Sequence, residues 1–184
     1  MKKIFYKWKH VEGACLEVAR QMSDHNWRPD YIVGITRGGL IPANLLSQYT
    51  GIKMHTLNVS LRDGDGGESN LWMAEDAIGA VPSDRSAEFG GHKHVEKLKK
   101  KILIVDDIND SGATLNWIME DWRSSCLPKA VDWDYVFNNN VRFAVIVDNL
   151  ASKCDVKMDY VGMEVNKAEK DVWIEFPYEE WWTK

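Results

Sequence analysis

The chain has 184 residues, 45% of them hydrophobic, and a formal net charge of −5. This length suits one domain with a core of its own. The acidic balance argues against a protein that binds nucleic acid by neutralising phosphates, and no apolar run approaches the roughly 20 residues of a membrane span. We therefore expect a small-molecule partner, with no nucleic acid and no membrane.

Cysteine usage indicates the compartment. Three widely spaced cysteines, none in a CxxC arrangement, suggest free thiols in a reducing environment: Cys15, Cys126 and Cys154. The amino-terminal "MKKIFYKWKH" is not followed by the apolar core of a signal peptide. We therefore expect a cytoplasmic protein.

Hydrophobic periodicity predicts helices alternating with strands. Helices are expected from Val11 to about Asn26, at 40–49 with Gly51 as a C-cap, at 71–78 and at 115–123. Strands are expected at 31–35, 54–61, 102–105 and 143–147, and more weakly at 158–161. This alternation is typical of an α/β protein with a mainly parallel twisted sheet and helices on both faces.

The region from about 62 to 101 departs from this rhythm. It is rich in glycine, ends in a lysine run, and is longer than most connections in a compact domain. It is interpreted as a flexible hood over a site, with an inert surface insertion as the alternative. The whole chain, 1–184, is expected to form one domain that carries this insertion.

The stretch "ILIVDDINDSGATL", residues 102–115, places two carboxylates after an apolar strand. Parallel strands bring their carboxyl ends to one edge of the sheet, where ligands bind. Ionised carboxylates only accept hydrogen bonds, so Asp106 and Asp107 suit the vicinal hydroxyls of a ribose.

The loop after these carboxylates leads into the next predicted helix, whose first N–H groups lack intrahelical partners and attract anions. Gly112 allows a close approach of the backbone. Together with the acidic pair, the loop predicts a site for ribose 5-phosphate. The alternative is that Asp110 or Ser111 only caps the helix and that the acidic pair is a solvated strand end.

This stretch resembles the phosphoribosyl pyrophosphate (PRPP) signature of type I phosphoribosyltransferases. The resemblance implies that Asp106 and Asp107 hold the ribose hydroxyls directly or through Mg²⁺. It also implies that Asp110 faces N7 of the base as a proton acceptor or donor. The 5′-phosphate would then be held by the loop residues Ser111, Gly112, Ala113 and Thr114.

A second stretch, "GITRGGLIPANLL" at 34–46, is similar to the pyrophosphate loop of the xanthine-guanine and hypoxanthine-guanine branch of that family. The matching residues are Thr36, Arg37, Gly38 and Gly39. The forked cation of Arg37 suits a diphosphate, and paired glycines expose backbone N–H groups. The alternative is a plain glycine turn between strand and helix.

A third stretch, "DVWIEFPYEEW" at 171–181, is similar to the base-binding segment of the same branch. It implies that Trp173 stacks on the purine, with Ile174 and Glu175 beside it. The alternative is that Trp173 anchors a terminal strand in the core.

The chain also departs from the branch at two places. The Ser-Tyr of the mobile loop is replaced by Ser60-Leu61, and Asp148 and Asn149 stand where a lysine normally binds the purine 6-oxo group. Lys153 is expected to reach this group instead.

The resemblance as a whole implies a PRPP-dependent glycosyltransferase of the pentosyltransferase type. Such an enzyme converts PRPP and a purine base, here a 6-oxopurine, into a nucleoside monophosphate and pyrophosphate in purine salvage. It would use Mg²⁺, with Asp110 and Arg37 as catalytic groups, and would form a homo-oligomer, either dimer or tetramer. The alternatives are a silent regulator that senses PRPP or a nucleotide, and a phosphoribosyltransferase for adenine or a pyrimidine.

Overall fold

The computed structural model describes residues 2–60, 66–67, 70–79, 98–127 and 131–183. Its main sheet has the order β4-β3-β2-β5-β6-β7, and neighbouring strands are parallel except for β4 with β3. The strands are β2 (Tyr31–Thr36), β3 (Met54–Ser60), β4 (Gly66–Gly67), β5 (Ile102–Asn109), β6 (Val141–Asn149) and β7 (Tyr160–Val165).

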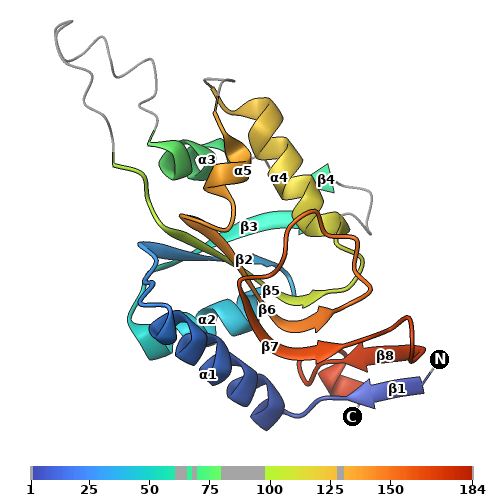
Figure 1. Cartoon of the computed structure of the whole chain (residues 1–184). Helices are drawn as coiled ribbons and strands as arrows, with labels where there is room; N and C mark the ends of the chain where they lie inside the picture. The colour runs from blue at the N-terminus through green and yellow to red at the C-terminus, as the bar shows by residue number, and fades with distance from the viewer. Residues whose placement is uncertain (1, 61–65, 68–69, 80–97, 128–130, 184) are drawn as a thin grey trace, which may run out of the picture.

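Helices cover both faces of this sheet (Figure 1). One face carries α1 (Trp8–Asp24) and α2 (Leu40–Thr50); the other carries α3 (Leu71–Ile78), α4 (Ala113–Ser125) and α5 (Trp133–Val136). Strand β5 serves both cores because successive side chains alternate. Ile102 and Ile104 pack toward α4, and Leu103 and Val105 pack toward α1 and α2. The predicted fold class is confirmed.

A second, two-stranded sheet joins the two ends of the chain. Strand β1 (Lys2–Phe5) pairs in parallel with β8 (Val172–Glu175), with Lys3 opposite Trp173. A 3₁₀ turn (Trp181–Thr183) follows β8, and both termini lie near this small sheet (Figure 1). Strand β1 was not predicted, because four residues beside a helix give little periodicity.

The helix and strand predictions are confirmed, with shifted ends. Helix α1 begins at Trp8 rather than Val11, and Gly51 ends α2 with a positive φ of 69° as expected. The important correction is in β5, which continues to Asn109 because its ladder with β6 continues to the pair Asn109 and Asp148. Asp106 and Asp107 therefore lie inside the strand and not after it.

The expected hood at 62–101 is corrected in part. Helix α3 has the predicted bounds, but Met73, Ala74 and Ala77 are buried in the main core. The Nζ of Lys100 lies 2.8 Å from Oδ2 of buried Asp76. Helix α3 therefore belongs to the body of the domain. Residues 61–65, 68–69 and 80–97, which include Leu61 and most of the remaining proposed hood, lie outside the described residues.

Two further expectations can be compared with the structure. All three cysteines are free thiols, as predicted. Within the part of the chain that the structure describes, no helix is long and apolar enough to cross a bilayer.

Candidate functional site

Strands β2 and β5 bring the two phosphate motifs together at the carboxyl edge of the sheet. The turn between β2 and α2 lies directly against β5. A Cβ atom at Gly38 would overlap the carboxylate of Asp107, and one at Gly39 would overlap the carbonyl oxygen of Val105. Both positions therefore require glycine because the turn packs closely against β5. The sequence had indicated a different reason, namely that paired glycines expose backbone N–H groups.

The same turn carries Thr36 and Arg37, joined by a cis peptide bond. The Thr36 hydroxyl donates to Oδ1 of Asn58 at 2.8 Å, and the Arg37 side chain is exposed. Asn58 lies on β3 and fixes the threonine. It was missed in the sequence because a single asparagine in a strand carries no signal.

Asp107 has an unusual environment for an acid. The Tyr178 hydroxyl donates to Oδ2 of Asp107 at 3.3 Å. Burial, with a smaller contribution from the Glu179 carboxylate, raises the pKa of Asp107 to about 6. Burial also raises the pKa of Tyr178, so its phenol stays a hydrogen-bond donor. Tyr178 and Glu179 lie in the segment predicted to bind the base, but the sequence assigned a role to neither residue.

Asp106 and Asp107 are adjacent but do not leave the strand on the same side, because side chains in a strand alternate between faces. Oδ1 of Asp106 accepts the backbone N–H of Asp107 at 2.9 Å. Among the described residues, no three His, Cys, Asp or Glu side chains could together hold a metal ion. Mg²⁺ is commonly held by one or two carboxylates together with substrate phosphates. Because the two carboxylates leave opposite sides of the strand, one of them would hold an Mg²⁺ ion that arrives with a diphosphate.

The predicted anion-binding loop precedes α4. Gly112 is the N-cap residue with φ of 85°, and the Ala113 N–H lies 3.3 Å from Oγ of Ser111. A Cβ atom at Gly112 would overlap backbone atoms of Cys154. Gly112 thus permits a close approach, as expected, but the approach observed is to the turn after β6. Thr114 follows in the first turn of α4.

The turn after β6 holds this loop by its main chain. The Lys153 N–H donates to the Ser111 carbonyl at 3.1 Å, and the Lys153 carbonyl accepts from Nδ2 of Asn116 at 2.9 Å. The Lys153 side chain is exposed. Nearby, the Asp148 carboxylate accepts from Nδ2 of Asn109 at 2.8 Å, and burial raises the pKa of Asp148.

Asp110 connects the loop to the predicted base-binding segment. Its carbonyl accepts from Nδ2 of buried Asn149 at 2.8 Å, and its Oδ1 lies 2.8 Å from Nζ of Lys167. The same Nζ lies 5.8 Å from the ring centroid of Trp173. The backbone N–H of Lys167 donates to Oδ1 of Asn149 at 3.0 Å. Lys167 was missed in the sequence because the connection from β7 to β8 has no motif.

Strand β8 presents the predicted base-binding residues. Trp173 is partly exposed, whereas Ile174 and Glu175 are buried. The Glu175 carboxylate accepts from Nζ of Lys3 at 3.2 Å, so β1 supports this strand by a side-chain contact as well as by its backbone.

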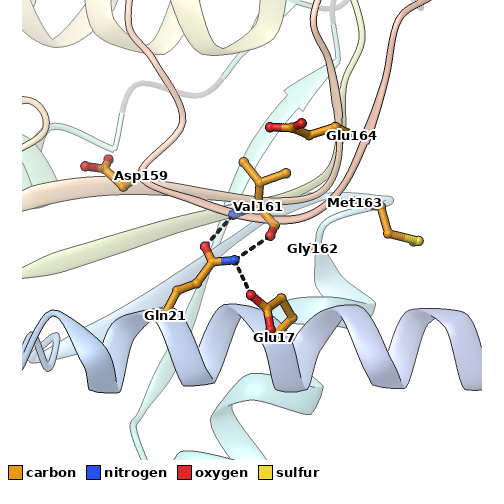
Figure 2. A pocket seen from close by; sticks show the side chains of 7 residues that line it. All are labelled: Glu17, Gln21, Asp159, Val161, Gly162, Met163 and Glu164. Atoms are coloured by element: carbon orange, nitrogen blue, oxygen red, sulfur yellow. Dashed lines mark hydrogen bonds between the residues drawn. The ribbon is translucent and has the colours of Figure 1, made fainter.

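A hollow of about 470 Å³ lies elsewhere, between α1 and β7 (Figure 2). Its lining includes the carboxylates of Glu17, Asp159 and Glu164, which would repel a diphosphate. The Gln21 amide donates to the Val161 carbonyl at 2.8 Å and accepts the Val161 N–H at 3.0 Å. Gln21 thereby satisfies part of the open edge of β7, and the acidic hollow suits a diphosphate less well than the carboxyl edge of the sheet does.

The fold is that of an α/β protein whose two glycine-containing motifs meet at the carboxyl edge of a parallel sheet, the edge at which such folds bind ligands. The model of the phosphoribosyl transferase domain family matches residues 2–180, and the chain belongs to this family. Phosphoribosyltransferases of this family are PRPP-dependent glycosyltransferases.

The relatives include purine enzymes. Xanthine phosphoribosyltransferase 1 of Saccharomyces cerevisiae is 27% identical over 129 residues, which cover 65% of this chain and 60% of the yeast protein. The xanthine-guanine phosphoribosyltransferase of Cereibacter sphaeroides is 28% identical over 154 residues, covering 83% and 70% of the two chains. A purine phosphoribosyltransferase from Pyrococcus horikoshii superimposes with a TM-score of 0.60 at 25% identity, covering 98% of this chain and 96% of that one.

Proposed function

We propose that the protein transfers the 5-phosphoribosyl group of PRPP to a 6-oxopurine, which is hypoxanthine, guanine or xanthine. The products are a nucleoside monophosphate and pyrophosphate, and the reaction serves purine salvage in the cytoplasm. The observation that carries this proposal is the contact between Gly38 and Asp107. This contact places a turn suited to a diphosphate beside a carboxylate suited to a ribose. PRPP carries both groups, so it requires both sites side by side.

Each part of PRPP has a matching part of the site. The 5′-phosphate binds at the start of α4, where N–H groups from Gly112 to Thr114 and the helix dipole favour an anion. Asp106 and Asp107 accept from the ribose hydroxyls. The diphosphate lies at the turn from Thr36 to Gly39, beside the exposed guanidinium of Arg37.

The chain's own groups then promote the transfer mainly by positioning and charge. Positive charge develops on the ribose ring as its bond to the diphosphate breaks, and Arg37 offsets the negative charge on the leaving group. Asp110 accepts or returns the proton at N7 of the base. Mg²⁺ held by Asp106 or Asp107 would neutralise part of the diphosphate charge when bound. Trp173 stacks on the base, with Ile174 and Glu175 beside it.

The test is a pyrophosphate-release assay with PRPP, Mg²⁺ and each of hypoxanthine, guanine, xanthine, adenine and uracil. The proposal expects release with at least one 6-oxopurine and little with adenine or uracil. The double variant Asp106→Ala, Asp107→Ala should fold normally and lose PRPP affinity by about two orders of magnitude or more, since two charged hydrogen-bonding groups are removed.

Three outcomes would contradict the proposal in different ways. Preference for adenine or uracil would keep the PRPP site and reject the base assignment. PRPP binding without release from any base would favour a silent sensor of PRPP or nucleotide. Unchanged PRPP affinity in the folded double variant would reject the ribose assignment itself.

A further inference from the structure

Lys167 is a largely buried cation that lies between Asp110 and Trp173, the two residues assigned to the base in the proposed function. Its side chain is 17% exposed, its Nζ lies 2.8 Å from Oδ1 of Asp110, and the same atom lies 5.8 Å from the Trp173 ring centroid. It comes from the connection between β7 and β8, far along the chain from the PRPP loop. An ammonium at this place is within reach of a base stacked on Trp173.

The backbone of Lys167 is fixed by the residue that also fixes Asp110. Oδ1 of Asn149 accepts the Lys167 N–H at 3.0 Å, and Nδ2 of Asn149 donates to the Asp110 carbonyl at 2.8 Å. Asn149 is buried, with 6% of its surface exposed. One amide therefore sets the distance between a proton acceptor and a cation that belong to two separate loops.

The pair of Asp110 and Lys167 matches one edge of a 6-oxopurine. Atoms N7 and O6 are neighbours on the same edge of the purine, and one forked side chain can contact both. A carboxylate accepts from a protonated N7, and an ammonium donates to O6. Adenine carries an amino group at position 6, which offers hydrogens where the ammonium also offers hydrogens. The arrangement therefore favours a 6-oxo group over a 6-amino group.

We propose that Lys167 reads the 6-position of the base. Without a base, its ammonium rests against Asp110; with a 6-oxopurine on Trp173, it turns to O6 and leaves Oδ1 of Asp110 free to face N7. Asn149 acts as a positioning residue for both. This inference rests on the proposed function and names the residue that sets its substrate class.

Other side chains are less well placed for this role. The Asp148 carboxylate is already held by Asn109, and as an acceptor it would repel O6. The Lys153 ammonium is exposed, and the turn engages that residue through its main chain.

The test compares the binding of two product nucleotides, inosine and adenosine monophosphate, by titration calorimetry. They differ in the group at position 6, and their binding requires no turnover. The variants are Lys167→Met, which keeps an unbranched chain over Trp173, Lys167→Arg, which keeps the charge, and Lys170→Met as the matched control. Lys170 lies on the same connection and is exposed.

For Lys167→Met we expect the affinity for inosine monophosphate to fall about ten- to hundredfold, as for a lost hydrogen bond from a charged donor. Affinity for adenosine monophosphate should be unchanged or higher. Lys167→Arg should recover part of the preference, and Lys170→Met should bind both nucleotides like the wild type.

An equal loss for both nucleotides in Lys167→Met would indicate a structural role and overturn the inference, and so would no loss for either. Pyrophosphate release by the wild type with 6-oxopurines is measured separately. If the wild type releases pyrophosphate with 6-oxopurines but Lys167→Met keeps the wild-type preference between the two nucleotides, the role of Lys167 is rejected and the proposed function stands. Absence of release with any base rejects the proposed function, while the titrations still decide what Lys167 recognises.

Discussion

The two halves of the proposed site are built in different ways. The half for the sugar and phosphates uses two continuous stretches, each a strand, a turn and the start of a helix: 34–40 and 102–114. The half for the base uses single residues from separate elements, namely Asn149 at the end of β6, Lys167 between β7 and β8, and Trp173 on β8. Strand β8 is in turn supported by β1. Asp110 belongs to both halves, since its backbone is in the first and its carboxylate contacts the second.

This difference separates what PRPP chemistry requires from what base selection requires. A strand followed by a helix start supplies backbone N–H groups for phosphate in a fixed geometry, and the side chains that this half adds lie within the same two stretches. Base selection depends on the direction of a few donors and acceptors, which loops can supply from any point of the chain. A change in the first half should affect every base alike, and a change in the second should alter the preference between bases.

The largest effect is expected at the junction. Asp110→Asn keeps the shape of the side chain but cannot accept a proton, so turnover should fall by roughly a hundred- to ten-thousandfold. PRPP affinity should change much less. Steady-state rates with varied PRPP and base give both quantities, and Asp155→Asn, an exposed acid after the β6 turn, is the control. Full activity in Asp110→Asn would remove this carboxylate from the mechanism.

A gain of stability is expected in the sugar half. Because its pKa rises from 3.8 to about 6 on folding, Asp107 binds its proton more tightly in the folded chain. This group therefore makes the fold less stable as pH rises from about 4 to 6, and the loss persists above pH 6. Asp107→Asn should raise the free energy of unfolding at pH 7.5 by up to about 3 kcal/mol, the equivalent of two pKa units.

The measurement is urea unfolding at pH 4 and pH 7.5 without PRPP or metal. The gain should be much smaller at pH 4, where the folded carboxyl is protonated and the unfolded one is only partly ionised. PRPP binding should be weakened at pH 7.5. Asp155→Asn again serves as control. If Asp107→Asn proved no more stable than the wild type at pH 7.5, the ionised Asp107 carboxylate would not destabilise the folded chain as its raised pKa indicates.

The same division explains what could be read from the sequence. The acidic strand end and the loop to Thr114 are contiguous, so periodicity and composition located them together. The Gly38 turn was found too, although its contact with Asp107 depends on the pairing of β2 with β5. Lys167, Tyr178 and Asn58 could not be found, because each acts across a contact between distant segments. Strand β1 was missed for the same reason, since only its partner β8 gives it structure.

A smaller effect should follow from displacing the loop before α4, which packs against the turn after β6. Gly112→Ala places a Cβ against the backbone of Cys154 at a φ of 85°, so the loop before α4 must shift. We expect a loss of about 1–3 kcal/mol in the free energy of unfolding. The control is Gly13→Ala in α1, where nothing lies within 4 Å of the new Cβ and a helix favours alanine by about 1 kcal/mol.

Urea unfolding of both variants should therefore give changes of opposite sign. Weaker PRPP binding should accompany the loss in Gly112→Ala, because the backbone that receives the 5′-phosphate has moved. Equal stability of the two variants would mean that the contact with Cys154 does not constrain the loop.

The smallest effect is expected at Lys3, which touches only the base half. Its Nζ donates to the buried carboxylate of Glu175, but the lysine side chain is 57% exposed, so water screens much of the pair. Lys3→Met should loosen β8, which carries Trp173, by an amount typical of exposed ion pairs. We expect the KM for the base to rise about two- to fivefold, with kcat and the KM for PRPP unchanged. Lys2→Met, on the same strand opposite Val172, should change none of the three. If the KM for PRPP rose together with that for the base, β1 would support the whole site, and the two halves would not be separable by mutation.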